Sequence, residues 1–306
     1  MEVRPGQRRT VEIPVARLPS QTMLGLPLTV LNGRHDGPRL WLSAAIHGDE
    51  LNGVEIIRQV LNRVEERKLR GLLIAAPIVN VFGFTHQSRY LPDRRDLNRS
   101  FPGSERGSLA SQVARLFMRE VVSHCTHGID LHTGSHHRIN LPQIRGNLAD
   151  EETARCAHAF GAPLILHATT RDGSLRQAGT AKGIPVLLYE AGEPLRFNED
   201  AIETGVDGIL RVMSALGMRR GRVKRVPSAP VEIWRSQWLR ARHSGIVRMD
   251  VKLGAKVRKR QQVCVIADAF GGAAASVRAP ADGYIIGRTL NPLVNKGDAV
   301  IHLGEI

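Results

Sequence analysis

The sequence predicts an α/β protein: a mixed, mostly parallel sheet flanked by helices, followed along the chain by a small all-β region. Up to Leu216, apolar segments typical of buried strands alternate with segments of helical spacing. Those strands are apolar on both faces, as in a parallel sheet that helices cover on each side. The pattern changes near Met218, after which short strands are separated by Gly and Pro turns. We therefore expect two domains, residues 1–225 and residues 226–306.

The predicted strands begin with two short segments of alternating polarity, residues 10–14 and 23–31, which indicate a hairpin or edge strands. Asn32-Gly33 and residues 35–38 are turn signals that end this pair. The later strands are continuous apolar runs bounded by polar or turn residues. These are residues 38–46, 71–79, 128–132, 163–167 and 183–190.

The predicted helices have apolar residues at the three- and four-residue spacing of one helix face. Ser108 precedes one of them, and serine favours the position just before a helix. The four segments are residues 51–67, 109–122, 150–160 and 199–216. A basic stretch, residues 218–227, then links them to the β region, in which no helical pattern is convincing.

Composition excludes several classes of protein. Of the 306 residues, 42% are hydrophobic and 24% are charged, which excludes a disordered chain. The longest apolar stretch, residues 71–79, is too short to cross a bilayer, and no apolar run follows the charged N-terminus as in a signal peptide. The cysteines Cys125, Cys156 and Cys264 cannot all pair, and none lies in a CxxC motif. We therefore expect a reduced, cytoplasmic protein without a membrane partner.

The net charge of +14 raises the question of a nucleic-acid partner. Against this partner, the basic residues are spread along the chain, and aromatic residues, on which bases stack, make up only 4%. A small anionic substrate fits the charge as well. We therefore expect no nucleic acid and a small anionic ligand.

A candidate metal site comes from residues at the ends of two predicted strands. His47 and Glu50 follow residues 38–46 on a strand-to-helix turn, and His132 ends residues 128–132. Two histidines and a glutamate are a standard ligand set for catalytic zinc, and ligands in open α/β sheets gather at the carboxyl ends of strands. Asp130 points to the same side of its strand as His132 and could lie near the site. His136 and His137 are better explained as loop residues.

Further polar groups suggest catalysis. Glu190 ends an apolar strand, where a carboxylate is costly without a partner or a function, and it could act as a general base; Glu193 is a competing candidate on the next loop. Residues 89–103 form a predicted loop dense in Arg, Asp, Asn and Pro. Its Asn-Arg pair could hold a substrate carboxylate. Without the neighbouring motifs, a solvated, salt-bridged surface loop would be the favoured interpretation.

Together these motifs resemble the succinylglutamate desuccinylase/aspartoacylase family, which belongs to the zinc carboxypeptidase-like hydrolases. The resemblance covers about residues 25–215. The C-terminal segments are similar to the small barrel-sandwich domain appended in this family. The motifs that carry the resemblance are His47-Gly-Asp-Glu50, Asp96-Leu-Asn-Arg-Ser-Phe-Pro-Gly103, Asp130-Leu-His132 and Glu190.

The resemblance implies a zinc-dependent hydrolase domain at residues 1–225 and a C-terminal β-domain at residues 226–306. It implies one Zn²⁺ per chain, bound by His47, Glu50 and His132. Glu190 would activate water and protonate the leaving amine, and Arg89 would polarise the scissile carbonyl. Asn98 and Arg99 would hold the carboxylate of the amino-acid half.

The activity implied by the resemblance is hydrolysis of an N-acyl amino acid to a carboxylic acid and a free amino acid. Two alternatives stay open: a metallocarboxypeptidase acting on peptides, and a non-catalytic binding protein on the same fold. The identity of the acyl group, the role of the β-domain and a homo-oligomeric state also stay open. If the substrate carries further negative charge, candidate partners of equal weight are Arg94, Arg95, Arg138 and Arg171.

Overall fold

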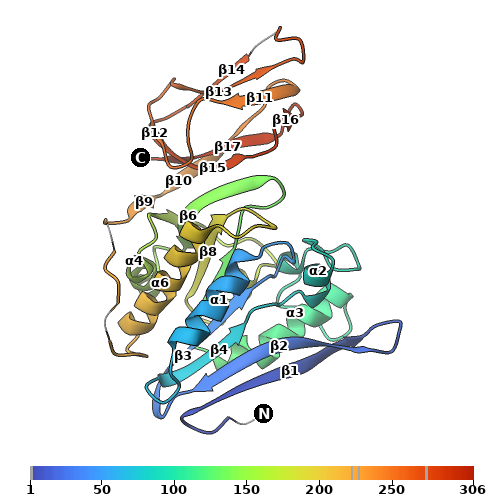
Figure 1. The fold of residues 1–306 in the computed structure, drawn as a ribbon, viewed down its shortest axis with the longest axis vertical. Coiled ribbons are helices and arrows are strands. Elements are labelled where there is room, and N and C mark those ends of the chain that lie inside the picture. The colour runs from blue at the N-terminus through green and yellow to red at the C-terminus, as the bar shows by residue number, and fades with distance from the viewer. Residues whose placement is uncertain (1–2, 222, 227, 273–274) are drawn as a thin grey trace.

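The structure is a computed structural model that describes residues 3–221, 223–226, 228–272 and 275–306. A large mixed sheet carries helices on both faces, and the C-terminal region adds a second, antiparallel sheet (Figure 1). The predicted fold class is therefore confirmed. The predicted linker, residues 218–227, includes Arg222 and Pro227, which lie outside the described residues. The division into residues 1–225 and 226–306 stays a prediction.

The N-terminal strands form a hairpin, one of the two predicted arrangements. Strand β1 (Gln7–Arg17) pairs antiparallel with β2 (Met23–Asn32), and β2 joins the large sheet beside β4 (Arg70–Ala76). Strand β3 (His35–Ala44) begins earlier than predicted. Its pairing with β4 shifts register between His35 and Arg39, so the turn-like residues 35–38 are taken up as an irregularity within the strand.

The centre of the large sheet is parallel and places the candidate site. Strands β4, β3, β5 (His127–His132) and β8 (Val186–Gly192) are successive parallel neighbours. Their carboxyl ends therefore meet at one edge of the sheet. The chain segments that carry the candidate ligands leave the sheet at this edge.

The sheet continues from β8 through strands of both directions. Strand β6 (Arg138–Gly146) lies antiparallel to β8 and was not predicted. Strand β7 (Leu164–His167) runs parallel to both β6 and β9 (Val231–Ile233). Strand β6 also pairs with β15 (Gly283–Thr289), so hydrogen bonds carry one sheet into the C-terminal region.

The C-terminal region contains short strands, as predicted. Strand β15 pairs with β17 (Ala299–Glu305), which in turn pairs with β10 (Arg235–Arg240). The short strand β12 (Lys256–Val257) also pairs with β15. The second sheet runs in the order β14 (Ala275–Arg278), β13 (Gln262–Ala267), β11 (Gly245–Met249), β16 (Leu293–Val294). Buried aliphatic residues from both sheets form the core of this region.

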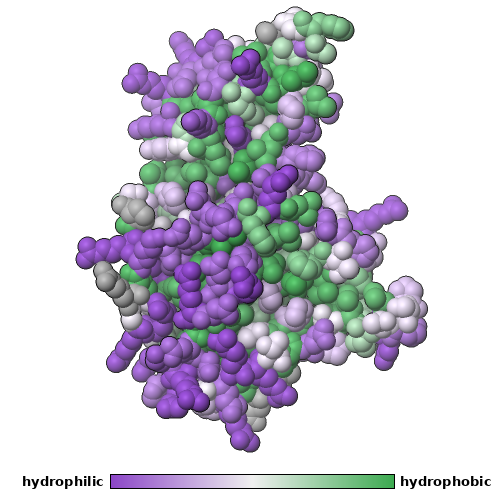
Figure 2. Space-filling model, viewed as in Figure 1, coloured by the Kyte–Doolittle hydropathy of each residue, from purple (hydrophilic) through white to green (hydrophobic). Residues whose placement is uncertain are grey.

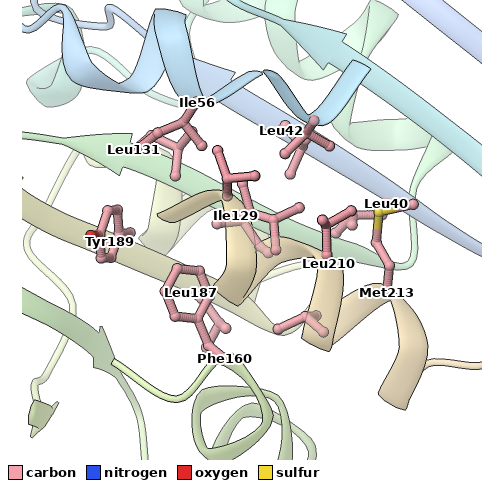
Figure 3. Packing of buried hydrophobic residues seen from close by; sticks show 14 of the residues in the cluster. Leu40, Leu42, Ile56, Ile129, Leu131, Phe160, Leu187, Tyr189, Leu210 and Met213 are labelled. Carbon is pink, nitrogen blue, oxygen red and sulfur yellow. The ribbon is translucent and has the colours of Figure 1, made fainter. Parts of the chain in front are cut away.

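Helices cover both faces of the large sheet. Helices α1 (Asn52–Arg63), α4 (Glu151–Phe160) and α6 (Glu199–Ala215) pack on one face over a core that includes Leu42 and Ile129 (Figure 3). On the other face, α3 (Leu109–Glu120) packs with two short helices, α2 (Val81–Thr85) and α5 (Leu175–Thr180). The described chain also has two 3₁₀ turns, Leu97–Arg99 and Val122–His124.

Capping residues explain where two predicted helices begin. The Asp150 carboxylate accepts a hydrogen bond from the Thr153 amide at 2.8 Å, and Ser108 Oγ accepts one from the Ser111 amide at 3.3 Å. Helix α4 ends at Gly161, whose φ of 69° is the left-handed conformation that glycine adopts readily.

The visible surface agrees with a chain that buries its apolar faces. Figure 2 shows hydrophilic side chains over much of the face in view, while hydrophobic residues appear between them, notably in the C-terminal region at the top. Within the described residues, no helix has the length and apolar character needed to span a membrane.

Candidate functional site

The three predicted ligands lie together at the carboxyl ends of the parallel strands. His47 and Glu50 occupy the turn between β3 and α1, and His132 is the last residue of β5. Gly48 lets this turn pack closely, because a Cβ at this position would lie 1.9 Å from the backbone carbon of Gly83. In the sequence HGDE, the packing of the turn therefore requires glycine at position 48, while the polar residues are required by the site.

The ligand atoms face one another. His47 Nδ1 lies 2.7 Å from Glu50 Oε1, and His132 Nδ1 lies 2.8 Å from Glu50 Oε2. All three side chains are buried, and their nearest ligand atoms lie within 4.8 Å of one another. His136 and His137 are exposed residues outside this group.

Each histidine uses its second ring nitrogen to contact a carboxylate. His132 Nε2 lies 2.8 Å from Asp130 Oδ2, and Asp130 Oδ1 accepts a hydrogen bond from Ser43 Oγ at 2.7 Å. His47 Nε2 lies 3.2 Å from Asp96 Oδ1. Carboxylates in these positions fix the orientation of both rings and leave both Nδ1 atoms directed at the centre of the group.

The carboxylates and imidazoles of this group shift one another's pKa values. Burial alone would raise the pKa of Glu50, but the charges of His47 and His132 outweigh it and hold that pKa well below its usual range. Burial would conversely lower the pKa of His132, yet Asp130 and Glu50 raise it well above the ordinary histidine value. The buried carboxylates thus favour positive charge at this place, which a cation bound between the three side chains would supply.

The donor set fits a zinc ion. Two imidazole nitrogens and one carboxylate converge, and each imidazole is oriented from behind by an aspartate. His47, Glu50 and His132 are thus the residues that could hold the metal.

Glu190 lies beside this group, because its Cα pairs with that of His132 across the parallel strands β8 and β5. Asn140 of β6 donates a hydrogen bond from Nδ2 to Glu190 Oε2 at 2.6 Å, and Arg145 Nη1 lies 3.8 Å from Oε1. The competing Glu193 instead faces Arg196, with 3.7 Å between Oε1 and Nε.

The loop before α3 brings its predicted residues to the same place. Arg89 lies between two carboxylates, 2.8 Å from Asp96 Oδ2 and 3.4 Å from Glu50 Oε1. Asn98 Oδ1 accepts a hydrogen bond from the Leu175 amide at the start of α5. Arg99 follows it, and all three predicted residues line the same cavity as the ligand group.

That cavity has a volume of about 830 Å³ and extends from the metal-ligand group to the C-terminal strands. The rings of Trp238 of β10 and His302 of β17 stack in its wall with 4.6 Å between their centroids, and Arg138 lies over Trp238.

Of the arginines proposed as further substrate contacts, Arg138 and Arg171 line the cavity. Arg94 and Arg95 are exposed residues outside its lining.

Several site residues were missed by the sequence analysis. Asp96 was quoted only as part of a motif, yet it links His47 to Arg89. Asn140 and Arg145 belong to β6, a strand that was not predicted, and Arg176 lies on the short helix α5. The signal that could have found Asp96 is its position two residues before Asn98, where an aspartate caps a helical turn.

A second cluster, His127, Glu152 and Cys156, also has ligand-type atoms close together. Glu152 is already bound there by both Nε and Nη2 of Arg155, and His127 Nε2 lies 2.9 Å away. Burial raises the pKa of Cys156 to about 12, which keeps its thiol protonated. This cluster is therefore a polar network that joins β5 to α4. Cys125, Cys156 and Cys264 are all free and buried.

Comparison with known proteins gives one decisive match. Residues 36–216 match the family model described as succinylglutamate desuccinylase/aspartoacylase catalytic domain. The chain belongs to this family. The match spans β3 to α6 and so includes every residue of the ligand group.

Relatives of this succinylglutamate desuccinylase/aspartoacylase family protein extend the likeness over nearly the whole chain. An N-alpha-acetyl-L-2,4-diaminobutyric acid deacetylase of Halomonas elongata is 27% identical, covering 92% of this chain and 86% of the relative. The product-bound ectoine utilization protein EutE (DoeB) of Ruegeria pomeroyi has a TM-score of 0.89 at 25% identity, covering 99% and 97% of the two chains. A succinylglutamate desuccinylase/aspartoacylase of Rhodobacter sphaeroides gives 0.86 at 26%, covering 99% and 96%.

Proposed function

We propose that this protein is a zinc-dependent deacylase that hydrolyses the amide bond of an N-acyl amino acid. Water is consumed, and a carboxylic acid and a free amino acid are released. The observation that carries the proposal is the convergence of His47, Glu50 and His132 beside Glu190 in one cavity. The deacetylase activity named for the Halomonas relative supports the same reaction class.

The residues divide the chemistry between them. His47, Glu50 and His132 would hold Zn²⁺, which supplies a Lewis acid that activates water and polarises a carbonyl oxygen. Glu190 takes the proton from the attacking water and delivers it to the leaving nitrogen.

The arginine and asparagine side chains contact the substrate. Because Asp96 fixes the Arg89 guanidinium beside the ligand group, Arg89 can stabilise the oxyanion that forms at the carbonyl. Asn98 and Arg99 would bind the carboxylate of the amino-acid half.

The charge of the cavity favours an anionic substrate. The described residues that line it include seven arginines but only three glutamates, one of which belongs to the ligand group. Burial together with the neighbouring Arg145 and Arg171 lowers the pKa of Arg176 to about 10. A substrate with an additional carboxylate would relieve this repulsion, whereas a cationic side chain would add to it.

The test is metal analysis combined with an assay of amine release. Protein purified with zinc is expected to contain about one ion per chain and to release free amine from one or more of N-acetyl-2,4-diaminobutyrate, N-acetylaspartate and N-succinylglutamate. N-acetylaspartate and N-succinylglutamate, which carry an additional carboxylate, should be preferred over N-acetyl-2,4-diaminobutyrate. Glu190→Gln should abolish turnover while zinc remains bound. The matched control Glu193→Gln should retain activity, because Glu193 faces Arg196 outside the cavity lining.

Other outcomes would redirect the assignment. Release of a C-terminal residue from a free peptide, without turnover of N-acyl amino acids, would favour the metallocarboxypeptidase alternative. Absence of zinc after reconstitution would overturn the ligand assignment, and a non-catalytic binding protein would then explain the fold best.

A further inference from the structure

The Glu190 carboxylate is contacted by side chains of β6, the strand that also pairs with β15 of the C-terminal region. It is held from β6, where Asn140 binds Oε2 at 2.6 Å and Arg145 approaches Oε1. Asn140 is itself buried, with only 5% of its surface exposed. Its side chain therefore has little room to bind another partner. The residues packed around Asn140 consequently decide where the Glu190 carboxylate lies.

A bulge in β6 directs Asn140 toward Glu190. On strand β8, Asn140 pairs with Gly192 and Gln143 pairs with Glu190, so three steps along β6 face two steps along β8. Such an extra residue re-aims a side chain beside an active site. The Asn140 amide consequently reaches a residue two positions away from its own backbone partner.

The other side of Asn140 is set by Gly287 of β15, which is its backbone partner across the junction with the C-terminal region. A Cβ at Gly287 would lie 2.8 Å from Asn140 Oδ1, while His302 Cβ and the Ile139 carbonyl oxygen are both 3.4 Å away. The absent side chain at Gly287 thus leaves the space that the Asn140 amide occupies. An alanine there would meet the end of a side chain before it met any backbone atom.

We propose that Asn140 is a positioning residue for Glu190 and that β15, through Gly287, keeps Asn140 in place. This inference rests on the proposed function, in which Glu190 transfers the proton. A hydrogen bond to Oε2 fixes the rotation of the carboxylate and leaves Oε1 facing Arg145, which also lines the cavity. The C-terminal region then contributes to catalysis through the orientation of the base, in addition to its residues in the cavity wall.

Kinetics of Asn140 variants test the first half of the proposal. Asn140→Ala should lower kcat by about 10- to 100-fold with little change in KM, since a misplaced catalytic group slows the reaction without weakening binding. Asn140→Asp keeps the size but replaces the donor with an acceptor, so its loss should be at least as large. Zinc content should stay near one per chain in both. Asn147→Asp, just beyond the end of the same strand, is the matched control and should behave as wild type.

A double-mutant cycle tests the link to β15. Gly287→Ala should lower kcat in the same direction by a smaller factor, and it should have no further effect in an Asn140→Ala background, where the amide that it displaces is absent. Independent, multiplicative effects of the two changes would overturn the link through Gly287. Unchanged kcat in both Asn140 variants would overturn the positioning role.

Crystal structures of wild type and Asn140→Ala separate this proposal from the reaction itself. The Glu190 carboxylate should rotate away from its wild-type position in the variant. If it stays in place, the positioning role is refuted whatever the activity. If wild type hydrolyses no N-acyl amino acid, the proposed function fails, while the rotation of Glu190 still decides whether Asn140 and β15 hold it.

Discussion

At the scale of single residues, the site is organised by carboxylates behind the imidazoles as much as by the imidazoles themselves. Asp130 and Asp96 each contact the ring nitrogen that points away from the ligand group. The convergence of His47, Glu50 and His132 could be predicted because each residue follows or ends an apolar strand, where a buried polar group requires a partner or a function. The aspartate contact to His47 could not, because it joins segments 49 residues apart and depends on the path of the intervening loop.

The first residue-scale prediction concerns His132. Replacement of His132 by alanine removes one of three ligand atoms, so the variant should lose most of its bound zinc while its circular dichroism spectrum stays native. The exposed His136 provides the control, and His136→Ala should retain the metal. A His132→Ala protein that still binds one zinc per chain would remove this residue from the ligand set.

The second residue-scale prediction concerns Asp96. Asp96→Asn weakens the contact that orients His47 and the ion pair with Arg89, so zinc affinity should fall by about 10- to 100-fold. Competition with a chelator of known affinity measures this change. Glu105→Gln, an exposed substitution near Arg119, is expected to leave the affinity unchanged. Wild-type affinity in Asp96→Asn would show that the ring of His47 is oriented by its packing alone.

At the scale of elements, long periodic segments were predicted well and irregular ones were not. Helix α6 was expected at residues 199–216 and spans Glu199–Ala215, because its apolar face runs unbroken over the sheet. Strand β6 was missed because Pro142 and its polar residues disguise a strand that contains a bulge. Helix α5 was missed because six residues are too few for a periodic pattern.

The element-scale prediction concerns the start of α4. Asp150→Ala removes the hydrogen bond to the Thr153 amide and should lower the free energy of unfolding by about 1 kcal/mol, as for other capping residues. Urea denaturation measures this loss, and the deacylase activity should stay unchanged. Asp150→Ser keeps a capping oxygen and should restore most of the stability. An equal loss in both variants would assign the effect to the negative charge near the helix N-terminus.

At the scale of the whole molecule, stability should depend on pH through a histidine in the wall shared by the cavity and the C-terminal region. Burial, with Arg145 and Arg171 nearby, lowers the pKa of His302 to about 3. The unfolded chain binds this proton near pH 6.5 and the folded chain does not, so the contribution of His302 to stability falls as the pH drops from 6.5 toward 3. The neutral ring contacts Ser236 Oγ at 3.1 Å.

The corresponding measurement is unfolding by urea at pH 7 and pH 5. Wild type should lose about 2 kcal/mol more stability between these values than His302→Gln does, from the linkage of one proton over this interval. The exposed His243 gives the control, because His243→Gln should retain the wild-type pH dependence. Equal losses in wild type and His302→Gln would mean that the folded protein accommodates the charged ring.

The junction of the two regions has a consequence for how the molecule can be altered. One edge of β6 is shared, since β15 pairs with its first residues and β7 with its last, and the outer edge of β7 is paired by β9. Deleting residues 226–306 would uncover both edges at once. Open strand edges recruit other chains, so a truncated enzyme should aggregate rather than survive as a smaller catalyst. A C-terminal region taken from a relative would therefore have to bring versions of β15 and β9 that still pair with β6 and β7 of this chain.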